Sequence, residues 1–172
     1  MCVRGLLLFS LPLLVACPPP SGEPEPAASS PQVAPAAPAP ATPPGPEMVL
    51  ATRGGASVQE QVRAALASTD GRRLVVYVGA TWCEPCRRFH DAVEAGQLDE
   101  QLAGVRFLEF DHDAHHDGLE VAGYLKRFVP VFAIPQPDGR ASSRIHQGAV
   151  KGPGAVDFIL PRLEALLSQS PL

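Results

Sequence analysis

The chain has 172 residues, a formal net charge of −4 and a sequence pI near 5.7. This acidic balance gives no reason to expect a nucleic-acid partner. Residues 48–172 are numerous enough for one compact domain with a hydrophobic core.

Residues 1–16 have the anatomy of a signal peptide. Arg4 supplies a positive charge, and the apolar run that follows is too short to span a bilayer as a permanent helix. The run ends in Leu14-Val15-Ala16-Cys17, which resembles the lipobox of bacterial lipoproteins. We therefore expect cleavage before Cys17 and attachment of a lipid to it. The alternatives are an ordinary secretory signal cut nearby and a rare uncleaved anchor.

Residues 17–47 are expected to form a linker behind the lipid. The stretch from Pro18 to Pro46 contains twelve prolines and seven alanines, and it has few large apolar side chains to bury. It predicts an extended, flexible tether that reaches roughly 90 Å at most. Pro18 stands where an Asp would signal retention in the inner membrane. The expected location is thus the bacterial cell envelope on the periplasmic side, in the outer membrane of a diderm cell.

The first half of the domain alternates helices and strands. Ser57 and Glu60 form a capping box that predicts a helix ending near Asp70-Gly71. A nearly continuous apolar run at 74–78 predicts a strand covered on both faces. The next predicted elements are a helix from about Cys86, a short helical piece at 98–102, a strand at 105–110 and a helix at 119–127.

The second half predicts a β-hairpin and a closing helix. Strands at 131–134 and 143–147 flank a Pro- and Gly-containing turn, and a helix follows at 155–168. Pro161 lacks an N–H group and is expected to bend or divide this helix. Alternating strands and helices imply a parallel portion of the sheet, and the hairpin adds antiparallel strands. The pattern predicts an α/β fold with a mixed sheet.

Two cysteines stand where a strand meets a helix, in Trp82-Cys83-Glu84-Pro85-Cys86. A cysteine at a helix N-terminus meets unpaired N–H groups and the positive end of the helix dipole, and both stabilise a thiolate. Pro85 fits the first helical turn. We expect a redox pair in which Cys83 attacks and Cys86 resolves the mixed disulfide. The alternatives are a structural disulfide and a zinc site, which lacks further cysteines here.

Three motifs in order resemble the thioredoxin superfamily. They are Trp82–Cys86 after a buried strand, the cis-proline segment Phe128-Val129-Pro130-Val131-Phe132, and the glycine of Gln147-Gly148-Ala149. The resemblance covers residues 57–167 and implies a three-layer α/β/α fold with a central mixed sheet. It also implies a thiol–disulfide oxidoreductase that acts on protein thiols and disulfides, with the Cys83–Cys86 disulfide and no further cofactor. The residues implied for the substrate groove are Trp82, Pro85, Val129, Pro130 and Gly148.

Two positions depart from thioredoxins proper. Those proteins carry a buried Asp six residues before the first cysteine, and Tyr77 stands there in this chain. The lysine that partners the Asp falls at Phe107. Either Glu84 or a chain of water is then expected to take the proton of the resolving thiol. On this hypothesis Glu84→Gln shifts the pH at which Cys86 is released.

The spacing of the motifs indicates a subfamily. The Trp-Cys-Glu-Pro-Cys string resembles membrane-tethered reductants of cytochrome c maturation, but those carry an inserted strand and helix before the cis-proline. Only 43 residues separate Cys86 from Pro130, as in the thioredoxin-like module of thiol:disulfide interchange proteins. Glu84 beside Cys83 disfavours the thiolate, which favours a reductase. Such a reductase needs a membrane electron donor in an oxidising periplasm.

A polar segment at 111–117 holds three histidines and three aspartates. His112, His115 and His116 are candidates for a copper, nickel or zinc site. No spacing there dictates a coordination geometry, so we favour a polar loop in which Asp117 caps the next helix. Because some thioredoxin-fold lipoproteins deliver copper with a cysteine pair and a histidine, copper delivery is the alternative function.

Overall fold

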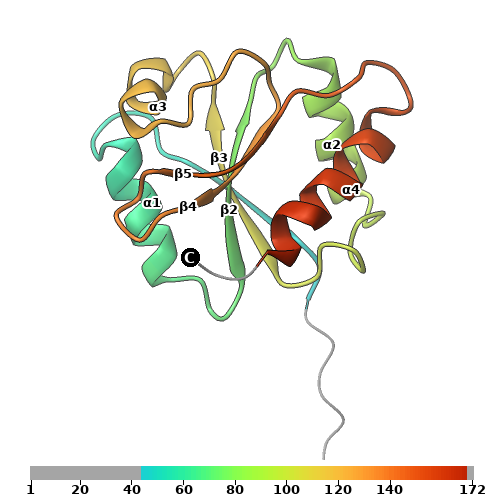
Figure 1. Cartoon of the computed structure of the whole chain (residues 1–172), viewed down its shortest axis with the longest axis horizontal. Helices are drawn as coiled ribbons and strands as arrows, with labels where there is room; N and C mark the ends of the chain where they lie inside the picture. Colours follow the sequence, from blue (N-terminus) through green and yellow to red (C-terminus); the bar gives the residue numbers. More distant parts are fainter. Residues whose placement is uncertain (1–43, 170–172) are drawn as a thin grey trace, which may run out of the picture. The chain divides into compact units, whose positions relative to one another are not determined.

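A mixed sheet forms the centre of the fold (Figure 1). In the computed structural model, which describes residues 44–169, its strands are β1 (Glu47–Leu50), β2 (Arg73–Gly79), β3 (Val105–Asp111), β4 (Val131–Pro135) and β5 (Ala141–Gln147). They lie in the order β1-β3-β2-β4-β5. Strand β3 is parallel to both β1 and β2, whereas β4 is antiparallel to β2 and β5. The predicted α/β class, mixed sheet and hairpin are confirmed.

Two helices cover each face of the sheet, which makes three layers (Figure 1). The helices are α1 (Val58–Ala67), α2 (Glu84–Glu94), α3 (His116–Ala122) and α4 (Ala155–Ser168). Helices α1 and α3 pack on one face, and α2 and α4 pack on the other. None of the described helices is long and apolar enough to cross a membrane.

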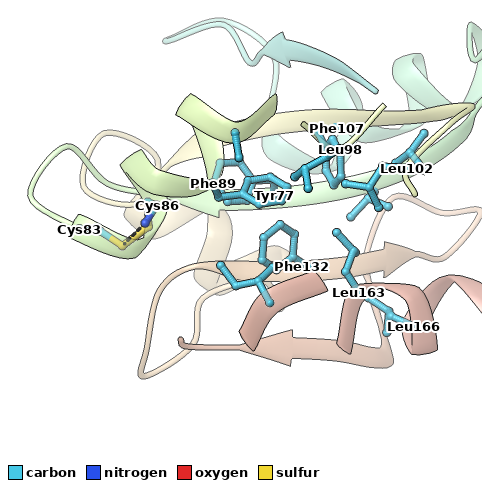
Figure 2. Packing of buried hydrophobic residues seen from close by; sticks show 14 of the residues in the cluster. Tyr77, Cys83, Cys86, Phe89, Leu98, Leu102, Phe107, Phe132, Leu163 and Leu166 are labelled. Atoms are coloured by element: carbon cyan, nitrogen blue, oxygen red, sulfur yellow. Dashed lines mark hydrogen bonds between the residues drawn. A yellow bond between two sulfur atoms is a disulfide. The ribbon is translucent and has the colours of Figure 1, made fainter. Parts of the chain in front are cut away.

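The central strand β2 supplies side chains to both cores. Val75 and Tyr77 point toward α2 and α4, whereas Val76 and Val78 point toward α1 and α3. This alternation follows from the two-residue period of a strand. Each such side chain contributes about 1.5–3 kcal/mol on burial. Figure 2 shows the core on the α2 side, with the cysteine pair at its edge.

Local start signals were predicted well. The Ser57 N–H donates to Glu60 Oε2 at 2.7 Å, and the Glu60 N–H donates to Ser57 Oγ at 3.3 Å, so the capping box is confirmed. Helix α2 begins at Glu84 with Cys83 as N-cap, two residues earlier than predicted.

Helix ends and short elements differ from the predictions. Helix α3 ends at Ala122 instead of Arg127, because Gly123 takes a positive φ of 83° and its N–H bonds back to the Glu120 carbonyl. Residues 98–102 form turns and no helix. Leu98 and Leu102 are still buried, so tertiary packing explains the apolar residues of this loop.

The prediction for Asp117 is wrong, and one of the two outcomes predicted for Pro161 is excluded. Asp117 does not cap α3, because the N-cap is His115 and Asp117 lies inside the first turn. Pro161 does not divide α4, which runs without a break from Ala155 to Ser168. Ile159 and Leu163 on either side of this proline are buried, so packing holds the helix where one backbone hydrogen bond is missing.

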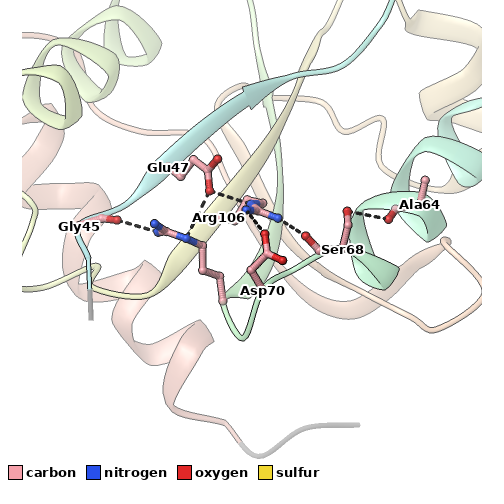
Figure 3. Close-up of polar contacts among 7 residues, drawn as sticks. Gly45, Glu47, Ala64, Ser68, Asp70 and Arg106 are labelled. Carbon is pink, nitrogen blue, oxygen red and sulfur yellow. Dashed lines mark hydrogen bonds and ion pairs between the residues drawn. The ribbon is translucent and has the colours of Figure 1, made fainter. Parts of the chain in front are cut away.

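The edge strand β1 was not predicted. It begins at Glu47, one residue before the expected domain boundary at Met48, and it pairs with β3. Arg106 of β3 donates to Glu47 at 2.8 Å and to Asp70 at 3.2 Å, and Arg72 donates to the Gly45 carbonyl at 2.9 Å (Figure 3). These contacts hold the start of the described chain against the sheet.

Candidate active site

The cysteine pair lies at the N-terminus of α2. Cys83 is the N-cap, and its Sγ accepts the N–H of Cys86 at 3.2 Å. Pro85 lies in the first turn, where its missing N–H costs nothing. The two cysteines form a disulfide, with Cα atoms 5.3 Å apart. The predicted cysteine pair therefore lies where the central strand β2 ends and helix α2 begins.

A groove of about 470 Å³ opens beside Cys83. Its walls include the predicted residues Trp82, Pro85, Val129 and Gly148. Pro130 is buried beneath the groove and does not line it; its peptide bond with Val129 is cis, and its carbonyl accepts the Gly148 N–H at 2.7 Å.

The groove has an apolar rim that the sequence motifs only partly predicted. Trp82, Phe128 and Val150 are 60%, 55% and 43% exposed, which is high for such side chains. Val150, Lys151 and Phe158 also line the groove. They were missed because they belong to the loop and helix after β5, and no local motif marks them.

The His/Asp segment supports Trp82. The indole N–H of Trp82 donates to Asp113 Oδ2 at 2.8 Å, and His112 Nδ1 lies 2.8 Å from the other oxygen of Asp113. Both contacts lower the pKa of Asp113, and the contact with His112 has the larger effect. The segment thus holds one wall of the groove.

The three candidate metal ligands have separate partners. His112 contacts Asp113, His116 contacts Asp117, and His115 lies within 3.2 Å of the Thr52 and Asp111 carbonyls. Among residues 44–169 no group of three or more His, Cys, Asp or Glu side chains is arranged to hold a metal ion.

Glu84 is tied to two neighbours. It forms an ion pair with Arg88, one turn further along α2, and its Oε2 accepts the Gly152 N–H at 3.0 Å. Both bonds lower the pKa of Glu84, and the bond from Arg88 has the larger effect. The carboxylate therefore links the active-site helix to the loop that walls the groove.

The rear of the cysteine pair has a different character. Tyr77 is fully buried in the position expected for an acid, and its burial raises the pKa of its hydroxyl. Phe107 is also buried, but the strand neighbour of Tyr77 is Glu109, and Phe107 lies opposite Val75.

A histidine–carboxylate pair near Tyr77 was missed by sequence reasoning. His90 Nε2 lies 2.9 Å from Glu109 Oε1, and the two rings of His90 and Tyr77 are 5.6 Å apart. The bond to Glu109 raises the pKa of His90, against the opposing effect of burial. One local signal was available: His90 follows Cys86 by four residues, which places both on the same helix face.

Comparisons with curated proteins find a thioredoxin as a relative. No family model matches the chain. Thioredoxin Asp f 28 of Aspergillus fumigatus is 31% identical over 90 residues, which cover 49% of this chain and 75% of that protein.

Among solved structures, a thioredoxin of Fasciola hepatica is 25% identical, with a TM-score of 0.38 and coverage of 52% of this chain and 80% of that one. A mutant thioredoxin of Halobacterium salinarum NRC-1 is 20% identical, with a TM-score of 0.44 and coverage of 77% and 100%.

Proposed function

This chain belongs to the thioredoxin family, and from that premise we propose that it reduces disulfides of proteins in the bacterial cell envelope while anchored to a membrane by lipid. It is a thiol–disulfide oxidoreductase, with Cys83 and Cys86 as its disulfide in CxxC spacing. One observation carries the redox part of the proposal: the pair sits at the start of α2, at the edge of a groove with an exposed apolar rim.

The first chemical step is assigned to Cys83. In the reduced protein the N–H of Cys86 and the dipole of α2 stabilise a thiolate at Cys83. This thiolate attacks one sulfur of a substrate disulfide, and the other sulfur leaves as a thiolate. A mixed disulfide between Cys83 and the substrate results.

The groove is assigned to the substrate chain around the disulfide. Trp82, Phe128 and Val150 offer apolar surface, and the Val129 backbone next to Pro130 is the predicted pairing partner of an extended chain. Lys151 adds one positive charge to the wall. Extended segments with apolar side chains near the cysteine are the substrates that this surface suits.

The direction of electron flow is tested by the redox potential. Equilibration of the full chain with glutathione gives the potential of the Cys83–Cys86 couple, and relatives span about −270 to −120 mV. We expect a value in the reducing half of this range, together with reduction of insulin. Cys83→Ser, which removes the attacking sulfur, is the control without activity. A potential at the oxidising end would reverse the assigned direction.

The membrane location rests on Cys17, which lies outside the described residues. Cys17→Ala in the producing cell is expected to move the protein from the membrane fraction to the soluble fraction and to abolish incorporation of a labelled fatty acid. An unchanged distribution between the fractions would remove the lipid anchor from the proposal. The anchored form would take its electrons from a membrane donor.

The same samples test the two alternative functions. Tight, stoichiometric copper binding by the reduced protein without insulin reduction would favour copper delivery. Between Cys86 and Pro130 the only regular elements are the rest of α2, β3 and α3 among the described residues. This spacing speaks against the cytochrome c maturation reductants, which insert a strand and a helix there.

A further inference from the structure

We propose that His90 and Glu109 act together as the acceptor for the proton that Cys86 loses when it resolves the mixed disulfide. The inference deepens the proposed function and rests on its thiol–disulfide exchange. It concerns the rear of the site, where Tyr77 leaves no buried acid on β2.

A cavity connects the four groups involved. It has a volume of about 320 Å³ and is lined by Cys86 and His90 from α2, Tyr77 from β2 and Glu109 from β3. Cys86 and His90 are one helical turn apart, and Tyr77 and Glu109 are register partners on adjacent strands. The second cysteine and the histidine–carboxylate pair therefore line the same cavity.

Two buried polar atoms in this region point to a water-mediated path. Within the described residues, Glu109 Oε2 and the Tyr77 hydroxyl are buried without a hydrogen-bond partner. Each such atom costs about 1–3 kcal/mol unless water reaches it. One water needs roughly 10–15 Å³ and two to four polar partners. The cavity is large enough for water, which can link the Cys86 thiol to the pair of His90 and Glu109.

Arg87 and Asp111 also line the cavity, and both have hydrogen-bond partners in the neighbouring loops. Asp111 Oδ1 accepts the Ala114 N–H at 2.8 Å, and Arg87 donates to the Thr81 carbonyl at 2.9 Å. Asp91 and Glu94 on α2 act on His90 only through their charge and support the higher pKa that the bond to Glu109 produces. The bond to Glu109 therefore makes His90 a stronger proton acceptor than a free histidine.

Resolution transfers one proton and exchanges the mixed disulfide for the Cys83–Cys86 disulfide. The Cys86 proton passes through water to the pair, which becomes an imidazolium with a carboxylate. The Cys86 thiolate attacks Cys83 Sγ, the Cys83–Cys86 bond forms, and the bond from Cys83 to the substrate sulfur breaks. That sulfur leaves with the electron pair and takes a proton from solvent, and the pair returns its proton to solvent. Two thiols of the protein are oxidised and one substrate disulfide is reduced.

The experiment separates the two cysteines in time. The reduced full chain, in excess, is mixed with dithiobis(nitrobenzoate), which releases one coloured thiolate when Cys83 attacks and a second when Cys86 resolves. In His90→Gln and Glu109→Gln we expect the second release to slow by about 10- to 100-fold at neutral pH. The first release should stay within about twofold, and the second should approach the wild-type rate at high pH, where hydroxide removes the proton.

The matched control uses an exposed residue outside the groove and the cavity. Glu100→Gln makes the same chemical change as Glu109→Gln and should leave both releases unchanged. A second release with the same rate and pH profile in wild type, His90→Gln and Glu109→Gln would overturn the proposal.

A measurement on the wild-type chain covers the case in which a variant does not fold. The His90 ring is titrated by NMR in the oxidised and reduced protein. Coupling to Cys86 predicts two different His90 pKa values, and identical values would overturn the proposal. Neither assay needs a lipid anchor or a protein substrate, so a failure here is distinguishable from a failure of the proposed function.

Discussion

The two cysteines of one disulfide face opposite surroundings. In front of Cys83 lies an open groove whose rim exposes Trp82 and Phe128 to solvent. Behind Cys86 lie Tyr77, which is fully buried, and the pair of His90 with Glu109 (Figure 2 shows Tyr77 and both cysteines). A four-residue motif therefore serves two tasks. Its front meets a substrate, and its rear supports the fold and handles a proton.

The largest effect is expected behind the cysteine pair, on the free energy of unfolding. Phe89 contacts the rings of Tyr77, Phe107 and Phe132 at centroid distances of 5.7, 5.5 and 5.0 Å. Phe89→Ala should lower the free energy of unfolding by about 3–5 kcal/mol, because it opens a cavity between α2 and the sheet. Urea unfolding of the oxidised protein measures this loss. Phe128→Ala in the front is the control, and an equal loss in both variants would break the comparison.

A smaller effect is expected in the groove in front of Cys83, on the rate of reaction with a protein substrate. Phe128 is 55% exposed at the groove rim, so Phe128→Ala should reduce kcat/KM for insulin by roughly tenfold through lost apolar contact. The reaction of Cys83 with dithiobis(nitrobenzoate), which is too small to span the groove, should change little. A parallel fall for both substrates would mean that Phe128 acts on the cysteines instead of on the substrate chain.

Stability should also depend on pH through His90. The folded-state pKa of His90 is raised by Glu109, so its stabilisation is fully present below the unfolded value of about 6.5 and is lost as pH rises through the folded pKa. The stability difference between wild type and His90→Gln should then be on the order of 1 kcal/mol at pH 5 and shrink at alkaline pH. A difference that grows with pH would contradict the pairing.

The smallest effect is expected for Glu84→Gln. The glutamine still accepts the Gly152 N–H, and the lost charge was already compensated by Arg88. The rate of the first coloured release should rise by no more than about threefold at low salt. On the hypothesis drawn from the sequence, Glu84→Gln instead shifts the pH dependence of the second coloured release, in which Cys86 resolves the mixed disulfide. A shift larger than that of His90→Gln would assign the proton to Glu84.

Features encoded within a few neighbouring residues were predictable from the sequence. The run at 74–78, the capping box at Ser57 and the hairpin were recognised because strand period, cap chemistry and turn residues act locally. The position of Cys83 and Cys86 at a helix start followed from the same kind of signal. By contrast, β1 was missed because four residues after a proline-rich run carry almost no pattern, and their partner β3 lies more than fifty residues away.

The sequence alone is enough to predict the class of the fold, the redox pair and the order of the three motifs. Only the tertiary structure decided what surrounds the pair: that the loop after β5 and Phe158 of α4 complete the groove, and that His90 meets Glu109 behind Cys86. The physical reason is the sheet order. Strands β2 and β3 are adjacent although α2 separates them in the chain, so a carboxylate of β3 reaches a histidine of α2 only after the sheet has formed.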